Sequence, residues 1–475
     1  MSTMPLNNYL ALPLCLLLTA CSHQPPPADP RGITPARWQS ALPPTATVNI
    51  TQWWAGFNSP QLNQLVAQAR AGSHDLNAAV ARVRQARSAA VAAGASLLPN
   101  VAAKLDANQE HLMRGPGYGQ LNTSPQQPTY HYFDAGLAAS YEVDFWGANA
   151  AARDSATLAL KASEYDRATV ELTLLGSVAD SYLATLAANE QARIATLNLA
   201  NAEQVLRLVR SRHGAGSATA LELAQQARLV AAQQRQLPLY RQQAQDNLIG
   251  LATLLGQPVQ QLQLMPQAFE QLHSPTADAG VPSELLLRRP DIAAAEARLA
   301  AAQADVNVAR AAMLPRLTIQ ATLGTGSEQA FELLRSPFYV LTTGLAAPVF
   351  NAGKLAAEKD KADARQLELL ENYRNVLLNS VADVEKALNA IGGLQQQRYW
   401  QAQELEEAAR AFALAQNRYQ AGADDLLSML ESQRALYQAQ DLQVQLRLAQ
   451  LKASVALYKA LGGGWATPQK ARKTS

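Results

Sequence analysis

The chain has 475 residues, a net charge of +2 and 16% charged side chains. This near-neutral balance lacks the broad basic field that nucleic-acid binding requires. Apolar residues make up 48% of the chain but aromatic residues only 6%, and alanine supplies much of the difference. The composition therefore predicts many close helix contacts rather than one bulky core. Two cysteines, Cys15 and Cys21, are too few for a disulfide framework.

The N-terminus has the features of a signal peptide. Residues 10–20 are an apolar segment too short to span a membrane as a helix, and the segment ends in Leu-Thr-Ala-Cys at Cys21. This ending resembles the lipobox of bacterial lipoproteins. The resemblance implies a signal peptide at 1–20, with a diacylglycerol and a fatty acyl group such as palmitate on Cys21. Ser22 at the next position implies sorting to the outer membrane. The alternative is an ordinary signal peptide that happens to contain cysteines.

A proline-rich stretch follows the lipidation site. Residues 21–52 contain runs of proline and are predicted to be an extended tether. The segment before the apolar core, residues 1–8, carries no Lys or Arg, so the sequence leaves open whether Met1 is the true start.

The rest of the chain repeats itself. Segments 75–99 and 291–315 share a heptad pattern at an offset of 216, with alanine at one seam position and Leu-Pro at the end. Small seam residues let helices approach closely, and a seven-residue period implies left-handed supercoiling, although a lone amphipathic helix is an alternative. At an offset of 206, Gly147 matches Gly353 and the run 212–216 matches 418–422. We therefore divide the chain into a first repeat at 53–257, a linker at 258–284, a second repeat at 285–465 and a tail at 466–475.

Each Leu-Pro is followed by residues that alternate between polar and apolar, which predicts β-hairpins at 100–146 and 316–350. The strand at 338–350 alternates less well, with Val340 and Thr343 out of phase. A soluble sandwich would bury the apolar face, whereas a membrane barrel would turn it to lipid. Glu142 and Asp144 on one face favour a wet lumen. Four strands cannot close a barrel, and open edges are not tolerated in lipid, so spanning strands would require an oligomer.

Very long helices are predicted after each hairpin. Residues 148–212 and 354–420 contain no proline and few glycines, although several ordinary helices with unrecognised loops would be an alternative. Gly214 and Gly216 in the first repeat and Gly422 in the second predict matching turns, and return helices are expected at 217–255 and 423–461. Pro238 is expected to kink or break the first return helix.

Catalytic and metal-binding patterns are absent from the sequence. None of the six histidines has a metal-ligand spacing, methionines do not cluster, and the run Gly324–Ser327 lacks the ending of a phosphate loop. We therefore predict a protein that is not an enzyme and has no catalytic residues, metal or cofactor apart from the lipid on Cys21.

Three segments carry a family resemblance that covers nearly all of the mature chain. Trp53–Phe57 (WWAGF), Leu286–Ile292 (LLRRPDI) and Leu457–Trp465 (LYKALGGGW) resemble those of the outer-membrane efflux family. The likeness is to its TolC-like, acylated branch that serves resistance-nodulation-division pumps. The resemblance implies a mainly α fold: a homotrimer with a twelve-stranded shared barrel, four strands per chain, above a long periplasmic α-helical barrel.

The same resemblance implies a gate at the periplasmic tips. The matching positions are Tyr419, Leu427 and Glu431, with Asp424 and Asp425 beside the turn; Gln420 departs from an arginine seen in some relatives. Leu427 and Glu431 lie four residues apart and so share a helix face. Helix packing and a solvated charge are the alternatives. Adaptor docking is expected at the small tip residues, namely Gly214, Gly216, Ser217, Ala421, Gly422 and Ala423.

We therefore expect a passive, gated exit duct in the bacterial outer membrane, lipid-anchored and mostly periplasmic. It would receive drugs or toxic compounds from an inner-membrane pump through a periplasmic membrane-fusion adaptor. A type I secretion duct and a poreless periplasmic coiled-coil lipoprotein are the alternatives. The sequence names neither the exported molecules nor the pump.

Overall fold

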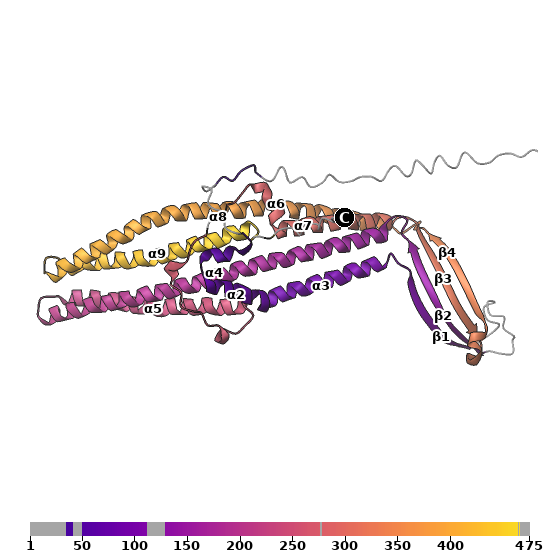
Figure 1. Cartoon of the computed structure of the whole chain (residues 1–475), viewed down its shortest axis with the longest axis horizontal. Helices are drawn as coiled ribbons and strands as arrows, with labels where there is room; N and C mark the ends of the chain where they lie inside the picture. The colour runs from indigo at the N-terminus through magenta and orange to yellow at the C-terminus, as the bar shows by residue number, and fades with distance from the viewer. Residues whose placement is uncertain (1–34, 41–49, 112–128, 276–277, 464, 466–475) are drawn as a thin grey trace, which may run out of the picture.

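A computed structural model describes residues 35–40, 50–111, 129–275, 278–463 and 465 of the chain. It has a long helical bundle with a four-stranded sheet at one end (Figure 1). The segment predicted to be a signal peptide, Cys21 and the C-terminal tail lie outside the described residues. Within the described parts of the chain, no helix combines the length and the apolar character needed to cross a bilayer.

The helices and strands recur in a similar order in the two halves of the chain. The first half contains η2 (Ile50–Phe57), α2 (Pro60–Gly72), α3 (His74–Ala95), β1 (Asn100–His111), β2 (Thr129–Val143), α4 (Ala148–Gly214) and α5 (Ala220–Leu254). The segment expected to be a linker carries η3 (Val259–Gln261), η4 (Phe269–Gln271) and η5 (Pro282–Glu284). The second half contains α6 (Leu285–Arg288), α7 (Pro290–Ala311), β3 (Arg316–Ser327), η6 (Ala330–Arg335), β4 (Pro337–Ala346), α8 (Lys354–Gln420) and α9 (Leu426–Ala460).

The two long helices, α4 and α8, are continuous over 67 residues each, or about 100 Å. The alternative of several shorter helices is therefore wrong. Each helix begins after a glycine in the left-handed conformation, Gly147 or Gly353. Asp144 accepts hydrogen bonds from the backbone N–H groups of Asn149 and Ala150 in the first turn of α4. β2 ends at Val143, so Asp144 caps a helix. The expectation that Asp144 lies on a strand is therefore wrong.

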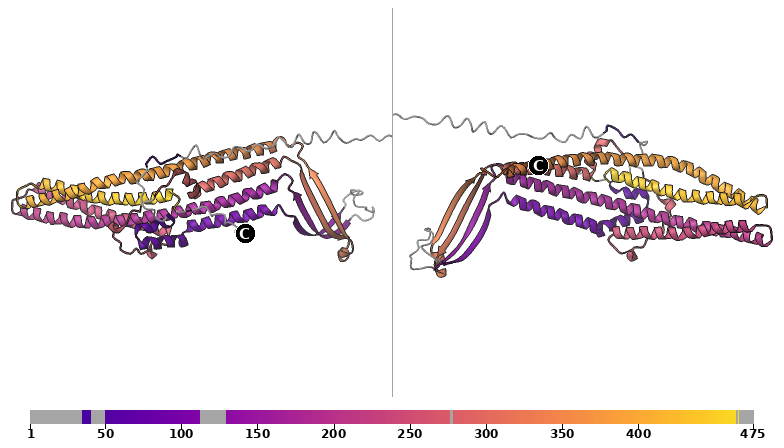
Figure 2. Two further views of the ribbon diagram at one scale, coloured as in Figure 1. Left: turned by 45° about the horizontal axis from the view of Figure 1, so that its top comes forward. Right: turned by 180° about the vertical axis from the view of Figure 1, so that it is seen from behind.

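Two shorter helices lie end to end along each long one: α3 and α5 beside α4, and α7 and α9 beside α8 (Figure 2). We expected Pro238 to kink or break α5; the helix runs through it, so the break is wrong, and the kink stays a prediction. The proline ring fixes φ near its helical value, so the helix can continue although the hydrogen bond to the preceding turn is lost and the ring crowds a carbonyl there.

The junctions between the stacked helices are built alike in both repeats. Gly256 follows α5 with φ +73, and Gly462 follows α9 with φ +89. A Cβ on Gly256 would collide with the carbonyl oxygen of Gly72, and one on Gly462 with that of Arg288. Glycine is therefore required at both positions for two reasons. Its backbone adopts a positive φ, and it leaves room for the end of α2 beside Gly256 and the end of α6 beside Gly462.

The sheet has the order β1-β2-β3-β4 with antiparallel neighbours throughout. The pairing places even-numbered residues opposite even-numbered residues in every strand pair, as in Asp106 opposite Asp134, Asp134 opposite Gly326 and Thr318 opposite Gly344. Because side chains alternate along a strand, the residue number alone assigns each one to a face. We call these the even face and the odd face.

The two faces differ sharply in chemistry. Every Asp, Glu, Lys and Arg of the four strands lies on the even face: Lys104, Asp106, Glu110, Asp134, Glu142 and Arg316. The odd face carries no charged residue other than the histidines and is mainly apolar, with Leu105 75% exposed and Leu341 69% exposed. A soluble sandwich would bury these leucines, so the sheet has the pattern of a membrane barrel wall. The register also places Val340 on the even face and Thr343 on the odd face, and β4 ends at Ala346.

A core built around η2 and the linker holds the two repeats together. Trp53 stacks on Tyr458 with the rings 5.6 Å apart. Tyr182 of α4 donates a hydrogen bond to Gln267 of the linker at 2.7 Å. Arg447 of α9 donates to the backbone oxygens of Phe269, Glu270 and Leu272.

A short piece of the tether is also fixed at this level. Trp38 is buried, and its indole N–H donates to the carbonyl of Gly280 at 2.9 Å. The carboxylate of Glu385 on α8 accepts from the backbone N–H groups of Gln39 at 2.7 Å and Ser40 at 3.1 Å.

Candidate functional site

The two helical tips lie together at the end of the bundle opposite the sheet (Figure 1). In the first tip, the N–H of Ser217 donates to the carbonyl of Arg212 at 2.8 Å. In the second tip, the N–H of Ala423 donates to the carbonyl of Arg418 at 2.9 Å. Gly216 and Gly422 both have left-handed φ values. Both turns are therefore Schellman motifs, in which a left-handed glycine lets the last helical carbonyls find partners.

The residues expected to dock an adaptor are all exposed. Gly214, Gly216 and Ser217 lie in the first turn, and Ala421, Gly422 and Ala423 in the second. A Cβ added at Gly214, Gly216 or Gly422 would meet no atom within 4 Å. The two tips are thus small, unobstructed knobs on which another protein could pack closely.

Two aspartates shape the start of α9. Asp425 caps the helix, since its carboxylate accepts hydrogen bonds from the backbone N–H of Ser428 at 3.0 Å and from its hydroxyl at 2.9 Å. These bonds hold the pKa of Asp425 below its usual value. Asp424 forms an ion pair with Arg418 at 3.2 Å, within the same tip. Both aspartates therefore stabilise the turn.

Leu427 and Glu431 lie on one exposed face of α9. Leu427 is 51% exposed although the preceding Leu426 is buried, and Glu431 is also exposed. The described residues place no ion-pair partner within reach of Glu431. The opposite face of α9 packs inward through Leu426, Met429 and Leu430. A hydrophobic side chain and a carboxylate are thus free to meet something outside the protomer.

Tyr419 differs from the other expected gate residues, because it is buried in the protomer. It belongs to a small tip core with Val205 and Val209 of α4, Leu229 of α5 and Phe412 of α8. This core joins both repeats at their tips. The structure therefore separates Tyr419, which supports the tip from inside, from Leu427 and Glu431, which face outward.

Arg212 connects the two tips, and the sequence analysis did not identify it. Its guanidinium donates to the carbonyl of Gln420 at 2.8 Å and lies 4.5 Å from the ring centroid of Tyr419. Arg212 belongs to the first repeat and both partners to the second. Its counterpart Arg418 instead pairs with Asp424 in its own turn. The match of these two arginines at the repeat offset could have drawn attention to both.

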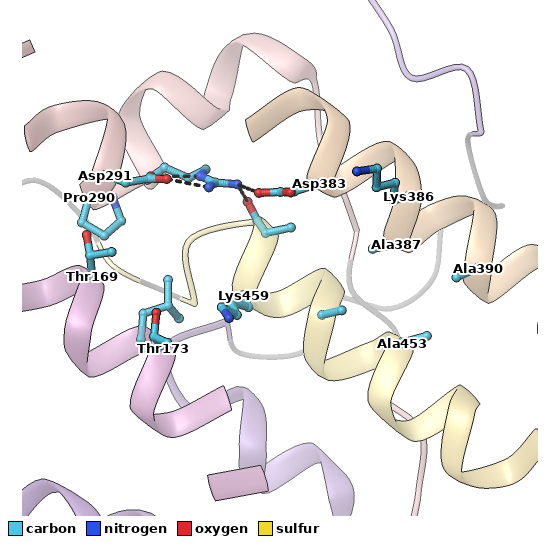
Figure 3. Close-up of a pocket in the computed structure, with 14 residues that line it drawn as sticks. Thr169, Thr173, Pro290, Asp291, Asp383, Lys386, Ala387, Ala390, Ala453 and Lys459 are labelled. Atoms are coloured by element: carbon cyan, nitrogen blue, oxygen red, sulfur yellow. Dashed lines mark hydrogen bonds and ion pairs between the residues drawn. The ribbon is translucent and has the colours of Figure 1, made fainter. Parts of the chain in front are cut away.

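Arg289, the second arginine of the LLRRPDI segment, lies at the junction of α7 and α9, beside a cavity of about 450 Å³ (Figure 3). Arg289 donates to Asp291 at 2.6 Å, to Asp383 of α8 at 3.1 Å and to the carbonyl of Ala460 at 3.2 Å. Burial lowers the pKa of Arg289, but the two aspartates outweigh it and raise the pKa overall. This segment therefore ties α9 and α8 to the start of α7, which is a structural role.

Comparison with known proteins agrees with this geometry. The family model of the outer membrane efflux protein matches residues 65–257 and 281–463. The chain is 56% identical over 463 residues to the pyoverdine export outer membrane protein OpmQ of Pseudomonas aeruginosa, covering 97% of this chain and 98% of that one. It is 58% identical over 465 residues to OpmQ of Pseudomonas putida, covering 98% of each.

Among solved structures, the outer-membrane channel OprN superposes with a TM-score of 0.84 at 28% identity, covering 91% of this chain and 97% of that one. Structural neighbours of this kind are TolC-like trimeric channels, in which a helical barrel continues into a β-barrel.

Proposed function

Because this chain belongs to the outer membrane efflux protein family, we propose that it is the exit duct of a tripartite export system. It is an outer-membrane efflux channel component and not an enzyme. The finer proposal adds a lipid anchor on Cys21, a gate at the tips, a periplasmic adaptor and an inner-membrane pump of the resistance-nodulation-division type.

The even and odd faces of the sheet carry this proposal. A four-stranded sheet with its charges on one face and uncovered leucines on the other suits the wall of a water-filled pore in lipid. Within the described sheet, the edge strands β1 and β4 each pair on one side only, so their outer edges have no partner strand. Lipid does not tolerate open edges, so β4 of one chain would pair with β1 of the next until the barrel closes.

The helices support the same closure. α4 packs between the stack of α3 and α5 on one side and the stack of α7 and α9 on the other. α8 is its counterpart in the second repeat, but among the described helices α7 and α9 alone make extensive contacts with it. α8 also carries exposed large side chains, including Tyr399 and Trp400. The duplication therefore leads us to place α3 and α5 of a neighbouring chain against α8.

In such a trimer, Leu427 and Glu431 would each form a ring of three at the periplasmic entrance. A leucine ring can close a narrow pore by excluding water, and a carboxylate ring favours cations over anions. We assign closure to Leu427 and charge selection at the entrance to Glu431. Asp424, Asp425 and Tyr419 would hold the turn and the tip core that position α9. The adaptor would contact the exposed knobs of both tips.

The substrate we propose is a pyoverdine-type molecule. Two relatives named for pyoverdine export are more than half identical over nearly the full chain, whereas the relatives named for toluene or solvent efflux are 28–30% identical. A wide duct does not need to recognise its cargo, so the assignment rests on the identity to these two relatives and not on a binding site in this chain. No feature of this chain favours type I secretion over efflux.

Single-channel recording tests the duct and its gate. The purified protein is placed in planar bilayers, and the wild type is compared with a Leu427→Ala, Glu431→Ala double variant. A low wild-type conductance that rises several-fold in the double variant supports the gate. Equal conductance of both proteins would place the gate elsewhere, and no conductance from either trimer would refute the duct.

Complementation tests the substrate. A Pseudomonas aeruginosa strain that lacks its pyoverdine export outer membrane protein is given this gene, and pyoverdine in the medium is measured. Restored export supports the assignment. An unchanged medium, with the protein present and folded in the outer membrane, would refute it. A Cys21→Ala variant with a cleavable signal peptide reports whether the lipid anchor is required.

A further inference from the structure

Three charged side chains meet half-way along the even face of the sheet. Asp106 of β1 and Asp134 of β2 are direct cross-strand partners. Lys104 of β1 contacts the carboxylate of Asp106 and lies 3.6 Å from that of Asp134. Like charges directly opposite each other destabilise a sheet, and the lysine relieves this repulsion. We call Lys104, Asp106 and Asp134 the barrel trio.

The side chains of the barrel trio are partly exposed on the even face, Lys104 by 63%, Asp106 by 34% and Asp134 by 21%. Its neighbours on the same rungs include Gly136, Gly324 and Gly326, which have no side chains to cover it. The two aromatic residues of this region lie across glycines. A Cβ at Gly326 would strike the ring of Tyr132, and one at Gly324 the ring of Phe338. The aromatic rings therefore lie over glycines of the neighbouring strands.

The dimensions of a closed barrel decide whether these charges matter. Twelve strands spaced about 4.8 Å apart and tilted by about 40° give a backbone radius of about 12 Å. Side chains reach about 5 Å inward, so their charges lie about 7 Å from the axis. The Debye length is about 10 Å at 0.1 M salt and about 3 Å at 1 M. The field of the barrel trio therefore fills the lumen at low salt and is screened from its centre at high salt.

We propose that the barrel trio is a second charge filter of the duct, separate from the tips, and that Lys104 sets its strength. This inference rests on the proposed trimeric pore. One lysine and two aspartates leave one negative charge per chain, so the ring favours cations. Glu110 and Glu142 on the same face have the same sign, and Arg316 at the helical end partly offsets them.

The test measures ion selectivity in a channel whose tip gate is already removed. In the Leu427→Ala, Glu431→Ala background, the reversal potential is recorded in planar bilayers under a KCl gradient centred on 0.1 M. Lys104→Gln is expected to raise the cation-to-anion permeability ratio about twofold or more, and Asp106→Asn to lower it. Lys104→Arg is the matched control, since it keeps the charge and should leave the ratio unchanged. At 1 M KCl the variants should converge.

Each outcome bears on a definite claim. Channels that conduct but show the same ratio for Lys104→Gln and Lys104→Arg at 0.1 M would overturn the filter while leaving the duct intact. A difference between them that persists at 1 M would also overturn it, because a screened ring cannot act there. Absence of conductance in the background protein would refute the duct itself. If Lys104→Gln fails to form trimers, Asp106→Asn and Asp134→Asn carry the test alone.

Discussion

Replacing Arg212 with alanine should loosen the contact between the two tips of each chain. Arg212 reaches from the first repeat to the Gln420 carbonyl and the Tyr419 ring of the second. From Val209 to the end of the tips, the described residues form no other side-chain hydrogen bond or ion pair between the two repeats. If the entrance opens by moving the tips apart, this contact must break in the open state.

The expected size follows from the two interactions. A half-exposed hydrogen bond from a guanidinium to a carbonyl contributes about 1 kcal/mol, and a cation–π contact at such a site about 0.5 kcal/mol. Losing about 1.5 kcal/mol of preference for the closed tip should raise the open population about tenfold per chain. Leu427 and Glu431 are untouched, so the conductance of an open channel should not change.

Single-channel open probability is the measurement, with Arg418→Ala as the matched control. Arg418 occupies the equivalent place in the repeat, but it pairs with Asp424 inside its own turn. It should therefore leave the equilibrium between tips nearly unchanged. An Arg212→Ala protein with wild-type open probability, or equal effects of the two substitutions, would refute the assignment of Arg212 as a link between the repeats.

Three further predictions concern the helical body. Gly462→Ala should prevent stable trimer formation, since Gly462 has φ +89 and abuts the Arg288 carbonyl. Gly250→Ala should be tolerated or stabilising, because Gly250 lies in the last turns of α5 and an added Cβ would meet no atom within 4 Å; equal melting temperatures of the two variants would contradict this. Burial raises the pKa of Asp180 despite Lys452 and Lys459. A carboxyl group whose pKa is higher in the folded protein than in the unfolded chain lowers the stability of the fold at pH values above its folded pKa. It has no such effect at pH values below its unfolded pKa of about 3.9. Asp180→Asn should therefore raise the melting temperature at pH 7, with the gain fading as the pH falls towards 4; a lower melting temperature at pH 7 would count against it. Glu385→Ala removes both acceptors of the Gln39 and Ser40 amides, so limited proteolysis should cut the tether faster there while the helical core stays resistant; an unchanged cleavage rate would contradict the clamp.

The parts of the fold that depend on local periodicity could be predicted from the sequence. Heptads and the absence of proline gave the long helices, and alternation after each Leu-Pro gave the four strands. Glycine at matching offsets located both tips, because a left-handed turn position requires glycine at the same place in each repeat. The same offset reasoning divided the chain into two equivalent halves.

Features that depend on distant partners could not be predicted. Arg212 and Gln420 are 208 residues apart, and Gln39 and Glu385 are 346 apart, so no local pattern connects them. The weak alternation of the last strand was resolved only by its register with β3, which assigns Val340 to the polar face. The expected break at Pro238 was wrong because a proline removes one hydrogen bond from a helix but does not always end it. Tyr419 resembled a gate residue by position, and only packing showed it to be internal.

The alternation of the even and odd faces restricts how the strands can gain or lose residues. Deleting a single codon within β1 would turn the residues beyond it to the opposite face and bring charges such as Lys104 or Asp106 into lipid. Each lysine or arginine so placed costs about 2–4 kcal/mol at the bilayer midplane, once per chain of a trimer. Loops have no such alternation, and the segment between β1 and β2 is already longer than that between β3 and β4. Natural variants should therefore differ freely in loop length, whereas their strands should gain or lose residues only in pairs.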